Sequence, residues 1–239
     1  MIDNPRMTPL TYPWLYATVR PRFASDTALE AALPQPRTPA QLRQLGDDRY
    51  LAAMTRRVFH AGVRHEMVDA RWPAFEEVFG GFAPEAMAAL GPDDLARQMQ
   101  DARLIRDRAK LQTVARNARF ILDVRQEQGG SFGAFIAGWP GEDIVGLWAV
   151  LARRGARLGG RSAAGFLRLV GKDTFLLTSD VVARLVAAGV VARAPGGLRD
   201  LAAVQQAFNA LQQASGRPLC QLSAMLAWSI NPVSTQPAP

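Results

Sequence analysis

Cysteine and histidine are scarce in this chain of 239 residues: Cys220 is the single cysteine, and His60 and His65 are the two histidines. A single cysteine excludes a disulfide bond within the chain, which is typical of a reducing cytoplasm. Three thiol and imidazole groups are too few for a structural zinc site, which takes four nitrogen or sulfur ligands. We therefore expect no zinc.

Long apolar segments are missing near the N-terminus. The first residues lack the apolar core of a signal peptide and the length of a membrane span. The sequence therefore predicts a cytoplasmic protein that has no membrane partner.

Lysine is nearly absent, because Lys110 and Lys172 are the only two, yet the formal net charge is +7. Arginine supplies the rest of the positive charge, and its guanidinium group matches the geometry of phosphate. A basic, arginine-rich chain favours a polyanion as partner. A GC-rich genome produces the same abundance of arginine and alanine, so charge alone leaves both explanations open.

Alternating polar and apolar residues, the pattern of half-buried strands, do not occur in any long run, whereas helical spacing does. We predict an all-α fold of about a dozen helices, arranged as a two-lobed helical bundle. Thr38 is expected to cap a helix that starts at Pro39. Further helices are expected over 47–61, 64–70, 106–126, 198–214 and 218–230, with a separate short helix opened by Trp72 and Pro73.

Prolines divide the chain into three parts. Residues 1–40 are proline-rich and irregular in pattern, but Tyr12, Trp14, Tyr16 and Phe23 indicate an arm packed on the body. Residues 41–231 form the predicted helical domain. Residues 232–239 are expected to be a flexible tail.

Two adjacent glycines, Gly159 and Gly160, predict a tight turn between one helix over 143–154 and another over 162–170. The N–H groups that open the second helix suit an anion such as a DNA phosphate. Arginines crowd around this turn, at positions Arg153, Arg154, Arg157 and Arg161. The pattern is that of a helix-hairpin-helix motif, although an ordinary helical corner has the same spacing.

Two segments, 59–79 and 101–122, resemble corresponding stretches of bacterial DNA-3-methyladenine glycosylase I. In the second segment, Leu104 to Arg106, Arg108, Lys110 and the run Asn117 to Arg119 stand in the family's order. Residues 171–230 resemble the wider helix-hairpin-helix glycosylase superfamily. The resemblance covers roughly residues 45–230 and implies an enzyme that removes alkylated purines such as 3-methyladenine from damaged double-stranded DNA.

The resemblance also implies site residues. Asp180, at the head of the helix after the hairpin, is the expected catalytic carboxylate. An N-cap formed by Ser179 and Asp180 is the structural alternative. The expected base pocket is Phe59, His60, His65 and Trp72. Phe59 and Trp72 are also candidates for the core, and the two histidines for partly exposed polar residues. The expected DNA contacts are Leu158, Gly159, Gly160, Arg161, Ser162, Lys172 and Arg184, with a monovalent cation that could bridge the hairpin and a phosphate.

Two positions depart from the family pattern. Arg57 stands where the family has a pocket glutamate, and His65 stands where it has a tryptophan that stacks on the excised base. The zinc ligands of the zinc-bearing members are also missing. These departures favour an alternative function, that of a DNA-binding protein of the same fold without glycosylase activity. A helical interaction protein with an incidental basic charge is a third interpretation.

The resemblance places the protein in a bacterial cytoplasm, associated with the nucleoid when it is bound to DNA. We expect a monomer. Base excision needs few catalytic groups, because an alkylated, cationic base is already a good leaving group. A sparse site is therefore compatible with the predicted activity.

Overall fold

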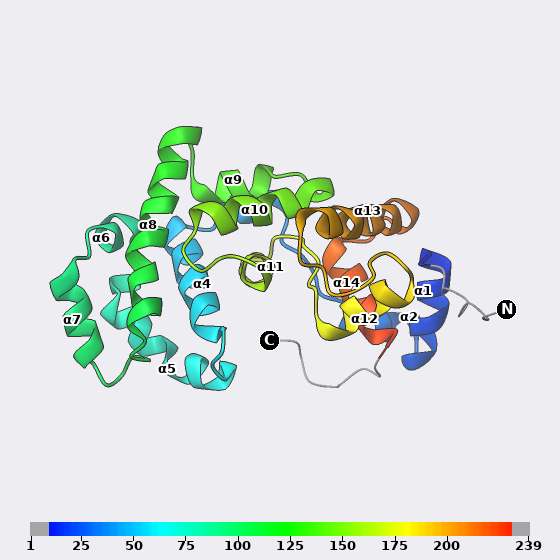
Figure 1. The fold of residues 1–239 in the computed structure, drawn as a ribbon, viewed down its shortest axis with the longest axis horizontal. Helices are drawn as coiled ribbons and strands as arrows, with labels where there is room; N and C mark the ends of the chain where they lie inside the picture. Colours follow the sequence, from blue (N-terminus) through cyan, green and yellow to red (C-terminus); the bar gives the residue numbers. More distant parts are fainter. Residues whose placement is uncertain (1–9, 231–239) are drawn as a thin grey trace. The chain divides into compact units, whose positions relative to one another are not determined.

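The structure is a computed structural model that describes residues 10–230. Within that range the chain forms fourteen α-helices and three short 3-10 helices, without a β-strand (Figure 1). The predicted all-α fold is therefore confirmed. The chain divides into two compact units, in agreement with the predicted two-lobed architecture.

The second unit holds residues 37–139 and 146–172 and contains the hairpin. Its long helix, α8, lies beside α4 and α6 (Figure 1). One face of α8 carries the buried residues Leu111, Val114, Ala118 and Ile121, which gives the helix an apolar side against its neighbours. The helices of this unit are α3 (Pro39–Gln44), α4 (Asp47–His60), α5 (His65–Val78), α6 (Pro84–Ala88), α7 (Pro92–Gln100), α8 (Arg108–Gln128), α9 (Phe132–Gly138), most of α10 (Ile144–Arg154), α11 (Arg161–Leu169) and the 3-10 turn Gly80–Phe82.

The start of α3 confirms the predicted cap. The Thr38 side chain accepts a hydrogen bond from Gln41 N–H, and the Gln41 side chain accepts one from Thr38 N–H. This reciprocal capping box satisfies two N–H groups that the first helical turn leaves without partners, and Pro39 needs none.

Among the described residues, the first unit holds 10–36, 140–145 and 173–230. Its elements are α1 (Tyr12–Val19), α2 (Asp26–Ala32), α12 (Ser179–Ala187), α13 (Leu198–Ser215), α14 (Leu219–Trp228) and the 3-10 turns Arg20–Arg22 and Gly141–Asp143. Segment 1–40 is more regular than its sequence pattern predicts, since α1 and α2 form between the prolines. Pro13 is tolerated because it lies in the first turn of α1, where a missing N–H costs nothing.

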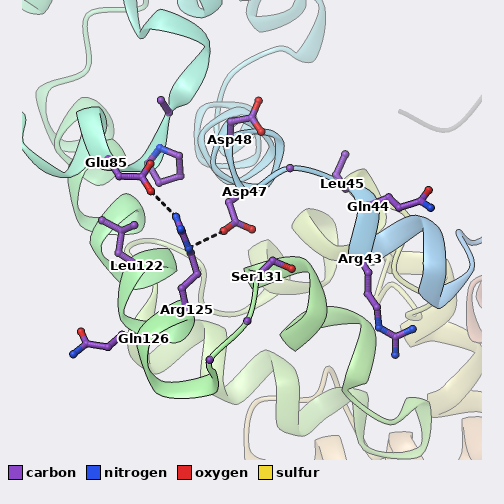
Figure 2. A pocket seen from close by; sticks show the side chains of 15 residues that line it. Arg43, Gln44, Leu45, Asp47, Asp48, Glu85, Leu122, Arg125, Gln126 and Ser131 are labelled. Carbon is purple, nitrogen blue, oxygen red and sulfur yellow. Dashed lines mark hydrogen bonds and ion pairs between the residues drawn. The ribbon is translucent and has the colours of Figure 1, made fainter.

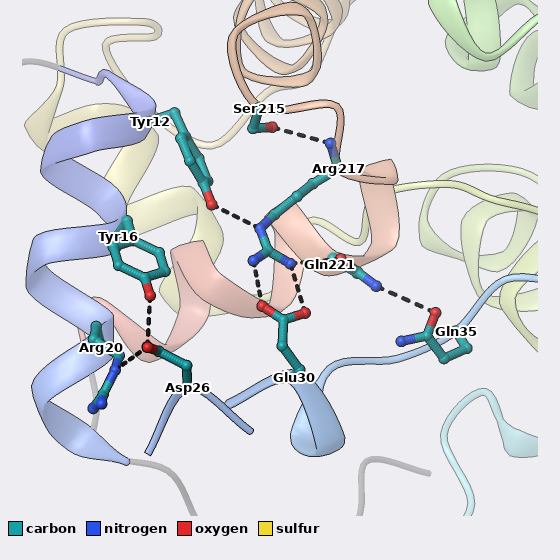
Figure 3. A network of polar contacts seen from close by, with 9 residues as sticks. All are labelled: Tyr12, Tyr16, Arg20, Asp26, Glu30, Gln35, Ser215, Arg217 and Gln221. Atoms are coloured by element: carbon teal, nitrogen blue, oxygen red, sulfur yellow. Dashed lines mark hydrogen bonds and ion pairs between the residues drawn. The ribbon is translucent and has the colours of Figure 1, made fainter. Parts of the chain in front are cut away.

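A polar network ties the start of this unit to its end. Arg217 donates to the Tyr12 hydroxyl at 2.8 Å, to Gln221 at 3.0 Å and to both carboxylate oxygens of Glu30 (Figure 3). α1 also packs against α13 and α14. The predicted division into 1–40, 41–231 and 232–239 stays a prediction, and the tail lies outside the described residues.

One helix boundary was predicted wrongly. Instead of two helices broken before Trp72, α5 runs without interruption from His65 to Val78 with Pro73 inside it. Trp72 and Phe75 on this helix stack on each other, and Trp72 also stacks on Phe82. This aromatic packing holds the helix together across the proline, whose usual effect is to break it.

No single helix among residues 10–230 is both long and apolar enough to cross a bilayer. The segments Phe132–Gly138 and Gly141–Arg154 reach the required length and composition only when they are taken together across a bend.

Candidate functional site

The hairpin has the predicted form of two helices joined by a short connection. α10 ends at Arg154 and α11 begins at Arg161. Gly160 adopts φ 56° and ψ −131°, a conformation that is essentially restricted to glycine. Gly159, Gly160 and Arg161 are exposed, and Ser162 is half-buried. The turn therefore presents its backbone to solvent at the head of α11. The Leu158 side chain is fully buried, so only the backbone of that residue remains to meet a ligand.

Asn117 of α8 anchors the connection of the hairpin. Its side-chain oxygen accepts from Ala156 N–H at 2.7 Å, and its amide nitrogen donates to Ala156 C=O at 3.3 Å. Both residues are buried. Arg154, at the end of α10, also forms a bidentate ion pair with Glu127 of α8, in which both N–O distances are 2.7 Å. Sequence reasoning placed Asn117 only in a matching segment and missed this anchoring role.

The predicted base-pocket residues divide into two groups. Phe59 is fully buried with its ring edge-on to Phe75. Trp72 is half-buried in the aromatic stack, and its indole N–H donates to Glu76 at 2.9 Å. These two side chains contribute to the core of the second unit, which is the structural alternative stated for both of them. A pocket role stays a prediction for both.

The two histidines form a stacked pair. Although Gly62 separates the helices that carry them, the rings of His60 and His65 lie 4.1 Å apart at an interplanar angle of 18°. Nε2 of His60 lies 3.0 Å from Oδ1 of Asp69, which also accepts from Arg56 at 2.7 Å. The fold thus gathers these four polar side chains at the junction of α4 and α5.

Burial lowers the pKa of His60, and the hydrogen bond to Asp69 opposes that shift without cancelling it. His65 and Arg56 also lower the pKa, through their charges. As pH falls below about 6.5, the unfolded chain gains a proton on this residue before the folded chain does. Folding stability should therefore decrease on acidification, by at most about 1.4 kcal/mol per pH unit for this one proton.

Denaturant unfolding of the wild type and His60→Gln between pH 7.5 and 5.5 checks this prediction. The slope of the unfolding free energy against pH should be shallower in the variant. Equal slopes would contradict it.

Asp180 is the second residue of α12 and is half-buried in the first unit. The N-cap of α12 is Thr178, whose hydroxyl accepts from Val181 N–H at 3.3 Å. The predicted cap formed by Ser179 and Asp180 is therefore wrong, because the helix begins one residue earlier than that cap requires. Capping does not account for Asp180, and its catalytic role stays a prediction.

Two residues that were predicted to contact phosphate form hydrogen bonds with other groups of the protein. Lys172 is buried, and its amine donates to Trp139 C=O at 2.6 Å. Arg184 donates to the side chain and the carbonyl of Ser229, each at 2.9 Å, and lies over the Trp14 ring. These contacts hold neighbouring segments together and compete with a DNA contact.

Sequence reasoning missed a cavity of about 850 Å³ in the second unit (Figure 2). The N-terminus of α4, α6, the end of α8 and the start of α9 line it. Arg125 spans its wall between Glu85 at 2.6 Å and Asp47 at 3.5 Å. Burial raises the pKa of Asp47 against the hydrogen bond from Phe132 N–H. No predicted site residue lines this cavity.

Among residues 10–230, no three His, Cys, Asp or Glu side chains gather closely enough to hold a metal ion. The expectation that the protein lacks zinc stays a prediction, as does the monovalent cation at the hairpin.

Residues 42–151 match the family model described as methyladenine glycosylase. No curated protein sequence matches the chain. Among solved structures, the chain is similar to the 8-oxoguanine DNA glycosylase of Thermotoga maritima, with 17% identity, a TM-score of 0.50, and coverage of 92% of this chain and 97% of that chain. The chain is also similar to the 8-oxoguanine DNA glycosylase of Methanocaldococcus jannaschii, with 13% identity and a TM-score of 0.51. That match covers 85% of this chain and 86% of that chain. For 3-methyladenine DNA glycosylase I from Staphylococcus aureus, the identity is 19% and the TM-score 0.47, and the match covers 69% of this chain and 86% of that chain. Residues 42–151 thus match the methyladenine glycosylase family, and the all-helical fold of the chain is similar to that of the two 8-oxoguanine DNA glycosylases.

Proposed function

We propose that the protein is a DNA glycosylase that hydrolyses the N-glycosidic bond of alkylated purines such as 3-methyladenine in damaged double-stranded DNA. The observation that carries this proposal is the match of residues 42–151 to the methyladenine glycosylase family. That stretch contains every predicted base-pocket residue and also α8, whose Asn117 anchors the hairpin. We further propose that the protein acts as a monomer in the bacterial cytoplasm.

Hydrolysis of the bond needs a carboxylate near the sugar. Cleavage builds positive charge on the sugar ring, as in glycoside hydrolysis. A carboxylate stabilises that charge and orients or deprotonates the attacking water. Asp180 is our candidate for this role. The target nucleotide must first leave the base stack and enter a pocket, for which the half-buried His65, stacked on the buried His60, offers an aromatic face.

The hairpin supplies a contact that is independent of sequence. N–H groups at the exposed head of α11 can donate to a backbone phosphate, together with Arg161 and Ser162. A monovalent cation could bridge the same phosphate. This contact positions the duplex without reading its bases.

Replacing Gly160 tests the hairpin contact. Because Gly160 has φ 56°, a Gly160→Val side chain forces the turn into another conformation, at a cost of about 1–3 kcal/mol. The variant should bind damaged and undamaged duplexes more weakly by the same factor. Fluorescence anisotropy with both duplexes measures it, and a loss confined to damaged DNA would contradict the assignment.

A second candidate function is DNA binding without excision. Arg57 and His65 favour it, because they occupy the two positions where the family pattern has a glutamate and a tryptophan. Incubation of the protein with a labelled duplex that contains one alkylated purine, followed by alkali, separates the two candidates. An excised base leaves an abasic site that alkali cleaves, whereas binding alone leaves the strand intact.

A further inference from the structure

Arg57 is a charged side chain for which the protein itself supplies no partner among residues 10–230. Its Nε atom is buried without a hydrogen-bond acceptor, and none of the ion pairs in that range involves it. Its neighbour Arg56, in contrast, pairs with Asp69 at 2.7 Å and lies over the Trp72 ring. A buried donor without an acceptor costs stability, so its presence requires an explanation.

Packing against the hairpin holds Arg57 in this position. The guanidinium lies across Gly165 on α11, where the Cβ atom of any larger residue would come within 2.5 Å of Nε and 2.8 Å of Cδ. Gly165 therefore provides the space that Arg57 occupies. The side chain is fixed on the second helix of the hairpin instead of extending freely into water.

A second cation, Arg161, stands one helical turn before Gly165 on α11, so both residues share one side of that helix. Burial lowers the pKa of Arg57, and the positive charge of Arg161 lowers it further. Arg161 is exposed and is the first residue of α11. None of the ion pairs among residues 10–230 involves Arg57 or Arg161, so an anion beside these two guanidinium groups would be attracted by both charges.

We propose that Arg57 joins Arg161 in an anion site that takes a non-bridging oxygen of a DNA backbone phosphate, so that Arg57 extends the contact that the hairpin makes. The proposal rests on the DNA-binding function above. The guanidinium fork suits phosphate oxygens.

The salt dependence of binding to an undamaged duplex tests the site. In Arg57→Gln we expect affinity at 0.1 M salt to fall about tenfold, and the slope of log K against log salt concentration to become shallower by about 0.9. Arg161→Gln, a change at an exposed position, should produce the same change in slope. Arg97→Gln is the control: it removes a charge that is exposed on α7 and paired with Asp94, and it should leave the slope unchanged.

Thermal unfolding in the absence of DNA excludes a structural cause. Because Arg57 has no internal partner, Arg57→Gln should melt at the wild-type temperature or above. A wild type that does not bind the duplex would refute the proposed function itself. A wild type that binds, with unchanged affinity and slope in Arg57→Gln, would refute only the phosphate contact of Arg57. A change in lesion preference with an unchanged slope would also overturn it, by assigning Arg57 to the base.

Discussion

Asp180→Asn should reduce the rate of base excision by a factor of about 10²–10⁴ while duplex affinity stays within about twofold. The amide is nearly isosteric but can neither stabilise the positive charge of the sugar nor accept a proton from water. Thr178 caps α12, so the substitution leaves the helix cap in place. Single-turnover excision on a duplex with one alkylated purine measures the rate.

Asp200→Asn is the matched control, because Asp200 occupies the first turn of α13 as Asp180 does that of α12. Both substitutions remove a favourable interaction with a helix dipole, about 0.3–1 kcal/mol. Equal losses of stability, with excision lost only in Asp180→Asn, would locate the catalytic carboxylate. Full activity of Asp180→Asn would refute that assignment.

Asn117→Ala should lower the free energy of unfolding by about 2–4 kcal/mol, because it leaves the N–H and the C=O of Ala156 buried without partners. We also expect weaker binding to every duplex, since the connection between α10 and α11 loses its anchor. Urea unfolding measures the loss of stability. Anisotropy titrations, carried out below the midpoint of unfolding so that the protein is folded, measure the loss of affinity.

Asn209→Ala provides the comparison for an amide on the surface. Asn209 is half-buried, donates to Glu142 C=O at 2.9 Å and accepts from Gln205. Its loss should cost about 1 kcal/mol or less, since water can replace the partner. If Asn117→Ala were no more destabilising than Asn209→Ala, or if it left DNA affinity intact, Asn117 would not anchor the hairpin.

Local patterns in the sequence predicted the helices well. Thr38 and Pro39 start α3 as predicted, because a cap depends on residues within one turn. The glycine turn of the hairpin follows from the same local logic. The run of α5 through Pro73 was missed because the aromatic packing that sustains it includes Phe82, which lies beyond the helix.

Contacts between distant segments could not be predicted. Asn117 and Ala156 are 39 residues apart, and the residues next to each of them give no indication that the two form hydrogen bonds. The contact of Arg57 with Gly165 depends on how α11 packs against α4. The burial of Lys172 could not be predicted either. The sequence indicated an exposed phosphate contact, but the Lys172 amine donates to a backbone carbonyl inside the protein.

Free base released from alkylated duplex DNA is the most direct measure of the proposed activity. The purified protein would be incubated with methylated DNA, and the small-molecule fraction analysed by mass spectrometry beside a buffer blank and Asp180→Asn. We predict that free 3-methyladenine accumulates with the wild type and stays near the blank with the variant. If the wild type bound the duplex in a salt-dependent manner and released no base, the glycosylase proposal would be wrong, and the chain would be a DNA-binding protein of this fold.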